Sequence, residues 1–217
     1  MNKKIIGLGL ATLLSSSYLS ASVIYSNDFS VDASGITGSN SVVTSPSGSQ
    51  FVGMLNYGET ASLDLSGLAA HTSVTLEFDV IGLRSLDGTS FSDNFQLLMN
   101  SNLVFTDYYG HNGWGGTDIT GPTTGTLVSH DASALGYGNY WGGASIYHYD
   151  LTFADVASAI SFDFIGNTDQ NWGDEAFGLD NITVSINDVQ AVPEPASLAL
   201  LGIGLAGIGF SRRKAAK

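Results

Sequence analysis

The sequence predicts an all-β domain, an antiparallel β-sandwich with jelly-roll-like topology, set between two targeting segments. Apolar residues recur at every second position in several short segments. Clusters of Gly, Asn, Asp and Ser separate these segments and mark turns. The middle of the chain, about 170 residues, is long enough for one domain with a buried core. We therefore divide the chain into residues 1–21, 22–190 and 191–217.

The predicted strands follow from this period of two. The alternation is clearest in four segments, residues 74–80, 147–153, 160–164 and 182–186. Shorter candidate strands lie at residues 23–29, 50–55, 61–65, 95–99 and 103–106. The turn Asn100-Ser101-Asn102 joins the last two as a hairpin. No segment of the domain predicts a long helix.

The N-terminus has the composition of a secretory signal peptide. Lys3 and Lys4 precede an apolar stretch at residues 5–14, and small residues follow around Ala21. The apolar stretch is too short to span a membrane as a helix. We expect export through the Sec machinery and cleavage by signal peptidase near Ala21.

The C-terminal segment combines three elements in order. Val192-Pro193-Glu194-Pro195 is followed by an uncharged stretch at residues 196–210 and by the basic residues Arg212, Arg213 and Lys214. As a helix the uncharged stretch is about 22 Å long, against roughly 30 Å for the hydrocarbon core of a bilayer. The basic residues favour the cytoplasmic side. We expect a marginal hydrophobic helix that stops transfer at the inner membrane.

This arrangement resembles the PEP-CTERM sorting signal of Gram-negative bacteria. The resemblance covers about an eighth of the chain. It implies that an exosortase, a membrane protease-transpeptidase, recognises Pro193, Glu194 and Pro195 and cuts near them. These residues are then recognition residues of a substrate. The protein is expected to be anchored transiently in the inner membrane and then to reach the cell envelope or the extracellular space.

The charge distribution excludes nucleic acid as a partner. Between Ser22 and Val192, Arg84 is the only Lys or Arg, against 19 acidic residues, which gives a formal charge of −18. A nucleic-acid-binding domain needs Lys and Arg to displace counterions from phosphates. The chain has no Cys, so no disulfide stabilises the domain. Core packing or a bound cation must offset the repulsion among the carboxylates.

Two further stretches resemble a domain that recurs in secreted proteins with this tail. The matching residues are Gly67-Leu68, His71, Phe78-Asp79, Leu86-Asp87-Gly88 and the run from Asp174 to Asn181. Leu86 and Phe177 stand where that domain has Trp. The resemblance implies a laminin-G- or lectin-like sandwich and no established activity.

The acidic residues suggest a Ca²⁺ site in a loop before the last strand. Asp174, Glu175 and Asp180 lie close together in sequence, and Asp87 or Asp93 can join them from another loop. Carboxylate oxygens are the ligands that Ca²⁺ prefers. The alternative is a solvated acidic loop in which Asp180-Asn181 caps a turn. Both interpretations predict that Asp180→Ala destabilises more than Asp107→Ala or Asp131→Ala, because Gly-rich loops should leave the latter two in water.

Two other functions remain open. Trp114, Tyr140 and Trp141 lie among glycines and amides, as in sugar-stacking platforms, although such aromatics also plug the ends of sandwiches. Glu77 and Asp79 share a strand face and resemble the acidic pair of sandwich glucanases, but the third acid is missing. The sequence thus predicts no enzyme. It predicts an exported structural or adhesive protein of the envelope or extracellular polysaccharide matrix, with a carbohydrate-binding module and a degenerate glycoside hydrolase as alternatives.

Overall fold

The computed structural model describes residues 19–111, 118–130, 134–138, 143–189 and 202–205. Most of the predicted signal peptide lies outside these residues, as do the whole Pro193-Glu194-Pro195 motif and Arg212, Arg213 and Lys214. Of the predicted hydrophobic helix at 196–210, only residues 202–205 are described, and these are helical. Within the described ranges no helix has the length and apolar character needed to cross a bilayer. The chain divides into two units, one of which is Ala21–Asp188.

The larger of the two main sheets has seven strands. The order is β11, β12, β6, β14, β4 and β3, and β1 also pairs with β14. Its long central strands are antiparallel, with Tyr149 opposite Phe78 and Leu179 opposite Val80. The strands are β1 (Leu19–Asn27), β3 (Val42–Thr44), β4 (Gln50–Leu55), β6 (His71–Arg84), β11 (Thr126–Ser129), β12 (Ala144–Ala154) and β14 (Glu175–Val189).

The second sheet has five strands in the order β2, β5, β13, β7 and β8. All four pairings are antiparallel. The strands are β2 (Ile36–Gly38), β5 (Glu59–Ser66), β7 (Asn94–Met99), β8 (Asn102–Tyr108) and β13 (Ala159–Asn167). A separate pair, β9 (Gly110–His111) and β10 (Asp118–Thr120), and two short 3-10 helices, η1 (Gly88–Ser90) and η2 (Ala134–Gly136), complete the described elements.

The hairpin between β7 and β8 forms as predicted. Asn100 and Ser101 both adopt positive φ, at 51° and 62°, which is the conformation that a tight two-residue hairpin turn requires. Asn tolerates this region better than most residues because its side chain bonds locally. Here the Asn100 side chain accepts a hydrogen bond from the Ser161 N–H at 2.9 Å, which also ties the turn to β13.

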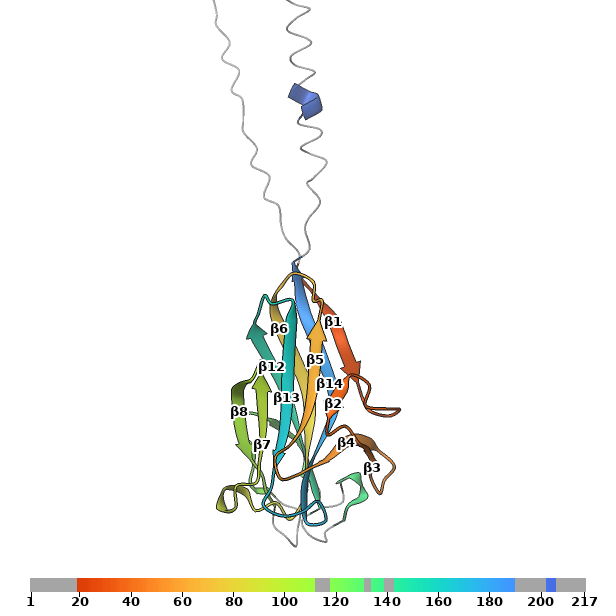
Figure 1. Ribbon diagram of the computed structural model, residues 1–217, viewed down its shortest axis with the longest axis vertical. Helices are drawn as coiled ribbons and strands as arrows, with labels where there is room; N and C mark the ends of the chain where they lie inside the picture. The colour runs from red at the N-terminus through yellow and green to blue at the C-terminus, as the bar shows by residue number, and fades with distance from the viewer. Residues whose placement is uncertain (1–18, 112–117, 131–133, 139–142, 190–201, 206–217) are drawn as a thin grey trace, which may run out of the picture. The chain divides into compact units, whose positions relative to one another are not determined.

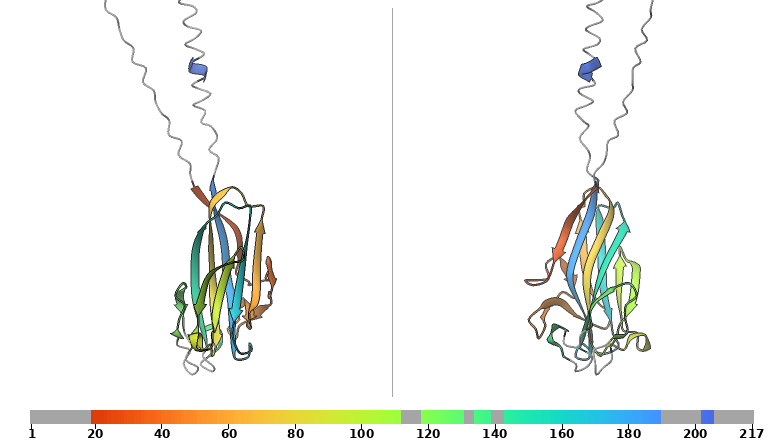
Figure 2. Two further views of the ribbon diagram at one scale, coloured as in Figure 1. Left: turned by 60° about the vertical axis from the view of Figure 1, so that its left-hand side comes forward. Right: turned by 180° about the vertical axis from the view of Figure 1, so that it is seen from behind.

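The two sheets pack face to face, as Figures 1 and 2 show, and enclose the main core. Along β13 every second residue is buried, from Ile160 to Gly166. Aromatic rings join the layers: Phe78 of β6 meets Phe164 of β13 edge-on at 5.2 Å, and Phe177 of β14 meets Phe95 of β7 at 5.8 Å. The predicted all-β antiparallel sandwich is confirmed. A laminin-G or lectin subtype is not specifically shown.

Candidate metal centre

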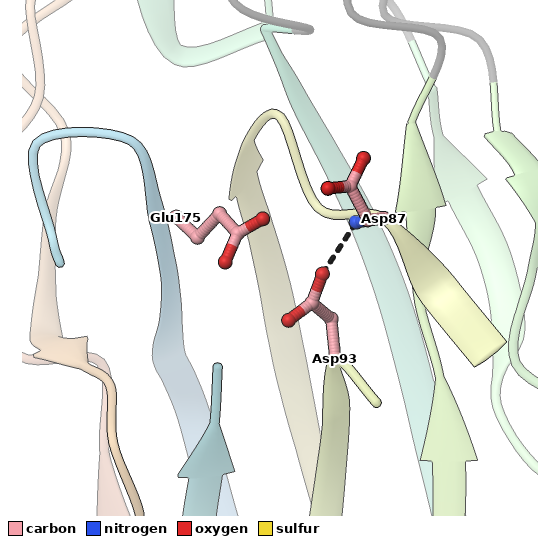
Figure 3. A group of neighbouring side chains, drawn as sticks. All are labelled: Asp87, Asp93 and Glu175. Carbon is pink, nitrogen blue, oxygen red and sulfur yellow. Dashed lines mark hydrogen bonds between the residues drawn. The ribbon is translucent and has the colours of Figure 1, made fainter. Parts of the chain in front are cut away.

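Three carboxylates from three different strand ends meet at one place in the sandwich. Asp87 lies between β6 and η1, Asp93 directly precedes β7, and Glu175 opens β14. One carboxylate oxygen of each residue lies within 4.8 Å of one oxygen of each of the others. Figure 3 shows that the carboxylates of Asp93 and Glu175 face one another. Because β6 and β14 belong to the larger sheet and β7 to the smaller one, the cluster bridges the two layers.

The backbone around Asp93 holds this acid in place. Its Oδ2 accepts a hydrogen bond from the Asp87 N–H, so the two loop residues are tied directly to each other. Its N–H donates to the Gly88 carbonyl at 3.0 Å, and its carbonyl accepts from the Tyr109 N–H at 3.0 Å. Gly88 has a φ of +67° and lies close to Thr120, so this turn requires glycine.

Two of the three acids are completely buried, and each has an oxygen that no hydrogen-bond donor in the described ranges reaches. The side chains of Asp93 and Glu175 are 0% exposed, and Asp87 is half-buried. Within the described residues no donor reaches Asp93 Oδ1 or Glu175 Oε2, so these two carboxyls can bond only to each other by sharing a proton, whereas Glu175 Oε1 accepts a long bond of 3.4 Å from Gln170. An unpaired buried carboxylate is strongly unfavourable. The arrangement therefore requires a proton or a cation.

The electrostatics of the cluster point the same way. Burial raises the pKa of Glu175 to about 9, and repulsion from Asp93, Asp169 and Asp87 adds to this shift. Burial also raises the pKa of Asp93 and that of Asp87. Arg84 does not contribute to these shifts, and its guanidinium donates instead to the Gly173 carbonyl. A divalent cation would remove the repulsion and the need for protons together.

The donor set suits a hard cation such as Ca²⁺. All three residues offer oxygen, and Ca²⁺ accepts six to eight oxygen ligands at about 2.3–2.6 Å. Oxygens on opposite sides of such an ion are then about 4.6–5.2 Å apart. The oxygens of Asp87, Asp93 and Glu175 meet this limit, since they lie within 4.8 Å of each other. These three residues would hold the ion, with backbone carbonyls and water completing its shell.

Two of the residues named from the sequence are not members of this cluster. Asp174 accepts a hydrogen bond from the Ser85 hydroxyl at 2.8 Å and acts on the cluster only by raising the pKa of Asp87. Asp180 lies further along β14, opposite Asp79 of β6. Its Oδ1 accepts a hydrogen bond from the N–H of the next residue, Asn181, at 2.8 Å, whereas a turn cap bonds to a residue two positions on.

The other candidate residues fall elsewhere. Trp114, Tyr140 and Trp141, the predicted sugar-stacking residues, lie outside the described ranges. Glu77 is exposed, and Asp79 is tied up in hydrogen bonds from the His148 ring at 2.7 Å and the Asn181 amide at 2.8 Å. Of the two acids named for the hydrolase alternative, Asp79 therefore bonds to side chains of the neighbouring strands, and Glu77 faces solvent.

Sequence reasoning named Asp93 and Glu175 without seeing that they are buried. The signal was present in the alternation. Asp93 has the same parity as Phe95 and Leu97, and Glu175 has the same parity as Phe177 and Leu179, so each acid faces the core side of its strand. When each of two strands has a carboxylate at the alternate positions that its buried apolar residues occupy, the pattern predicts a cation or proton shared by the two carboxylates.

Comparison with solved structures gives weak likenesses to carbohydrate-binding modules. A family 35 module from an environmental isolate is 16% identical, with a TM-score of 0.38, over 74% of this chain and 93% of that one. The family 35 module from Clostridium thermocellum is 12% identical, with a TM-score of 0.38, over 75% and 98%. The C-terminal CBM6 of LamC from Zobellia galactanivorans is 14% identical, with a TM-score of 0.35, over 77% and 99%. Scores this low carry no functional argument, and the fold rests on the strands described above.

Comparison of sequences identifies the C-terminal segment. None of the curated proteins matches the chain. Residues 191–214 match the family model described as the PEP-CTERM protein-sorting motif. This match supports the resemblance seen in the three-part tail. The motif implies export, a membrane-anchored sorting signal and processing by an exosortase, a membrane protein.

Proposed function

We propose that this protein is an exosortase substrate that is released as an acidic β-sandwich into the cell envelope or the extracellular polysaccharide matrix. Its role there is structural or adhesive and not enzymatic. The observation that carries the proposal is the sorting motif at residues 191–214, which follows the all-β unit Ala21–Asp188 in the sequence. The signal peptide expected at residues 1–21 supports the same route, since it starts the export that the motif completes.

The cluster of Asp87, Asp93 and Glu175 supports a structural role. We infer that it holds Ca²⁺, which is abundant outside cells and is bound by oxygen ligands. An ion there would connect the end of β6, the start of β7 and the start of β14, and so clamp the two sheets together. With no cysteine in the chain, a metal clamp takes the part that a disulfide has in many exported domains. The metal stabilises the fold by binding only the folded state.

The sorting proposal is tested by replacing Pro193, Glu194 and Pro195 with alanine in the natural host. The full-length chain should accumulate in the inner membrane, because the apolar stretch and basic residues still stop transfer while the recognition element is gone. Membrane fractionation and immunoblotting measure the ratio of full-length to processed chain. The released wild-type domain should co-fractionate with extracellular polysaccharide.

A matched control changes residues just before the matched segment. Val189→Ala with Gln190→Ala alters the same connection and leaves residues 191–214 intact. This variant should be processed and released as the wild type is. Normal release of the triple-alanine variant would overturn the sorting proposal.

A further inference from the structure

A polar groove lies on the Ala21–Asp188 unit, and none of its lining residues belongs to the acidic cluster. It has a volume of about 420 Å³, within the range of small-molecule sites. Three segments line it: the connection from β2 to β3, the end of β4 with the start of β5, and the loop before β14. The lining residues are Gly38, Ser39, Asn40, Ser41, Val43, Gly53, Met54, Asn56, Glu59 and Trp172.

Trp172 is the aromatic residue of this groove. Trp172 is 59% exposed, although the large side chain of tryptophan usually has most of its surface buried. The loop beneath it is well ordered by hydrogen bonds. The Gly173 N–H donates to the Asn171 side chain at 2.9 Å, and the Asp174 N–H donates to the Asn171 carbonyl at 2.8 Å. The indole is therefore presented to the groove by a fixed turn.

Asn56 couples Trp172 to the acidic residue of the groove. With its amide nitrogen toward Glu59, Asn56 donates to Oε2 at 2.9 Å, and its oxygen accepts from the backbone N–H of Trp172 at 2.9 Å. The Asn56 side chain is buried, whereas Glu59 is exposed. Glu59 thus keeps its other oxygen available at the groove surface in a set orientation. Asn40, held by a bond from its amide to the Ile36 carbonyl at 3.1 Å, faces the same space.

The chemistry of these residues selects a class of ligand. An exposed indole offers a flat apolar surface, and a carboxylate, amides and serine hydroxyls beside it offer donors and acceptors. A sugar ring has this dual character, with C–H groups on one face and hydroxyls at its edge. None of the ten lining residues is Lys, Arg or His. Phosphates, sulfates and uronates would meet no positive charge there, and a formal charge of −18 between Ser22 and Val192 repels them.

We propose that this groove binds an uncharged saccharide, with Trp172 stacking on a sugar ring and Glu59 and Asn40 contacting its hydroxyls. The inference deepens the proposed matrix role and rests on it, since it names the polysaccharide class that the released domain would contact. It uses residues that the metal site and the sorting motif do not use. An extended peptide is the other occupant of such a surface, and the test below includes it.

The experiment uses the full-length chain in mild detergent. A glycan array carries neutral oligosaccharides of glucose, mannose and galactose, uronate-containing and sulfated oligosaccharides, and unrelated peptides. Calorimetry then measures the affinity for the strongest neutral binder. Trp172→Ala should weaken binding about tenfold or more, which is the value of a lost aromatic contact of this kind. Asn40→Ala should weaken it less.

Tyr57→Ala is the matched control. Tyr57 lies in the turn between β4 and β5, is 61% exposed and is not among the residues lining the groove. This variant should bind as the wild type does. Unchanged affinity in Trp172→Ala, binding only of acidic glycans or peptides, or no binding of any neutral oligosaccharide would each overturn the proposal. Processing of the tail is measured separately, so failure here leaves the sorting proposal standing.

Discussion

The carboxylates of Asp93 and Glu175 face each other across the sandwich (Figure 3), and no donor in the described part of the chain reaches Asp93 Oδ1 or Glu175 Oε2. One residue precedes a strand of the smaller sheet and the other opens a strand of the larger sheet. The pair therefore links the two sheets. Whether this link stabilises or destabilises the sandwich depends on what neutralises the carboxylates. With both acids ionised it pushes the sheets apart, and with a cation it holds them together.

Ca²⁺ should stabilise the protein more than Na⁺ does at matched ionic strength. An ion that binds only the folded state, at a free concentration of 100 times its dissociation constant, adds about 2.7 kcal/mol to the free energy of unfolding. For a domain of this size this corresponds to a rise in Tm of about 5–10 °C. Differential scanning calorimetry in CaCl₂, in NaCl and in chelator measures this rise in Tm. Asp93→Asn should abolish the calcium-specific part.

Asp64→Asn serves as the control for that loss. Asp64 is an exposed acid on β5, far from the cluster in sequence and sheet position, so its removal changes net charge by the same amount. The calcium-specific rise in Tm should persist in this variant. Equal rises with CaCl₂ and NaCl in the wild type would reduce the effect to screening and contradict the metal site.

In chelator, stability should fall as pH rises. The pKa of Glu175 is raised from 4.5 to about 9, so the folded state binds more protons than the unfolded state between these values. Stability is therefore fully present below about pH 4.5 and is lost as pH rises toward 9. Thermal melts at pH 5 and pH 8 should differ by at least about 3 °C.

Glu175→Gln separates this effect from other titrations. The amide cannot ionise, so the fall in Tm between pH 5 and pH 8 should shrink, and in chelator at pH 8 the variant should melt above the wild type. In CaCl₂ the order should reverse, because the amide is a poorer ligand. A variant less stable than the wild type under both conditions would show that Glu175 has a packing role alone.

The hydroxyl of Tyr149 should be worth more than an ordinary surface contact. It lies 2.8 Å from the Tyr109 hydroxyl and donates to Asp107 Oδ2 at 3.0 Å, and all three groups are buried. Tyr149→Phe leaves two buried polar atoms short of a partner and should cost about 1–3 kcal/mol by urea denaturation. In a double-mutant cycle with Tyr109→Phe, additive losses would contradict a shared network.

The long strands were predictable because each is half-buried. In the segments 74–80 and 160–164 the sequence alternates apolar and polar residues, and the structure buries Val74, Leu76, Ile160 and Phe162 on the core side. The short strands β2, β3 and β10 escaped prediction, since three residues carry no readable period. Their positions depend on pairing with longer strands and not on their own sequence.

The candidate sites were predictable only in part. Asp87, Asp93 and Glu175 were named individually, but about 80 residues separate Asp93 from Glu175, and no local pattern shows that their strands end together. Trp172 was not singled out, because a single aromatic residue in a polar loop looks the same whether it packs or is exposed. The groove exists only after β4 and the loop before β14 have been brought side by side.

The final prediction concerns Asp107 and reverses an expectation from the sequence. Its Gly-rich surroundings suggested a side chain in water, but it is 2% exposed. Its carboxylate accepts hydrogen bonds from the backbone N–H groups of Thr123 and Thr124, both at 3.0 Å, and from the Tyr149 hydroxyl. Asp107→Ala removes the acceptor, leaves the buried Tyr149 hydroxyl short of a partner and frees the loop N–H groups of Thr123 and Thr124, so it should cost about 3 kcal/mol. Asp131, the other residue of that comparison, lies outside the described ranges.

Asp180 gives the contrast within the same experiment. Burial raises its pKa to about 6, repulsion from Asp79 adds to this, and among the described residues its side chain bonds to the adjacent Asn181 N–H alone. The stability that its neutral form provides is present below about pH 3.8 and is lost as pH rises through 6. Above pH 7, Asp180→Asn keeps the local acceptor without the charge and should therefore stabilise slightly. Urea denaturation at pH 7.5 should rank Asp107→Ala far below the wild type and Asp180→Asn at or above it, and the opposite ranking would show that the carboxylate of Asp180 has a partner of its own.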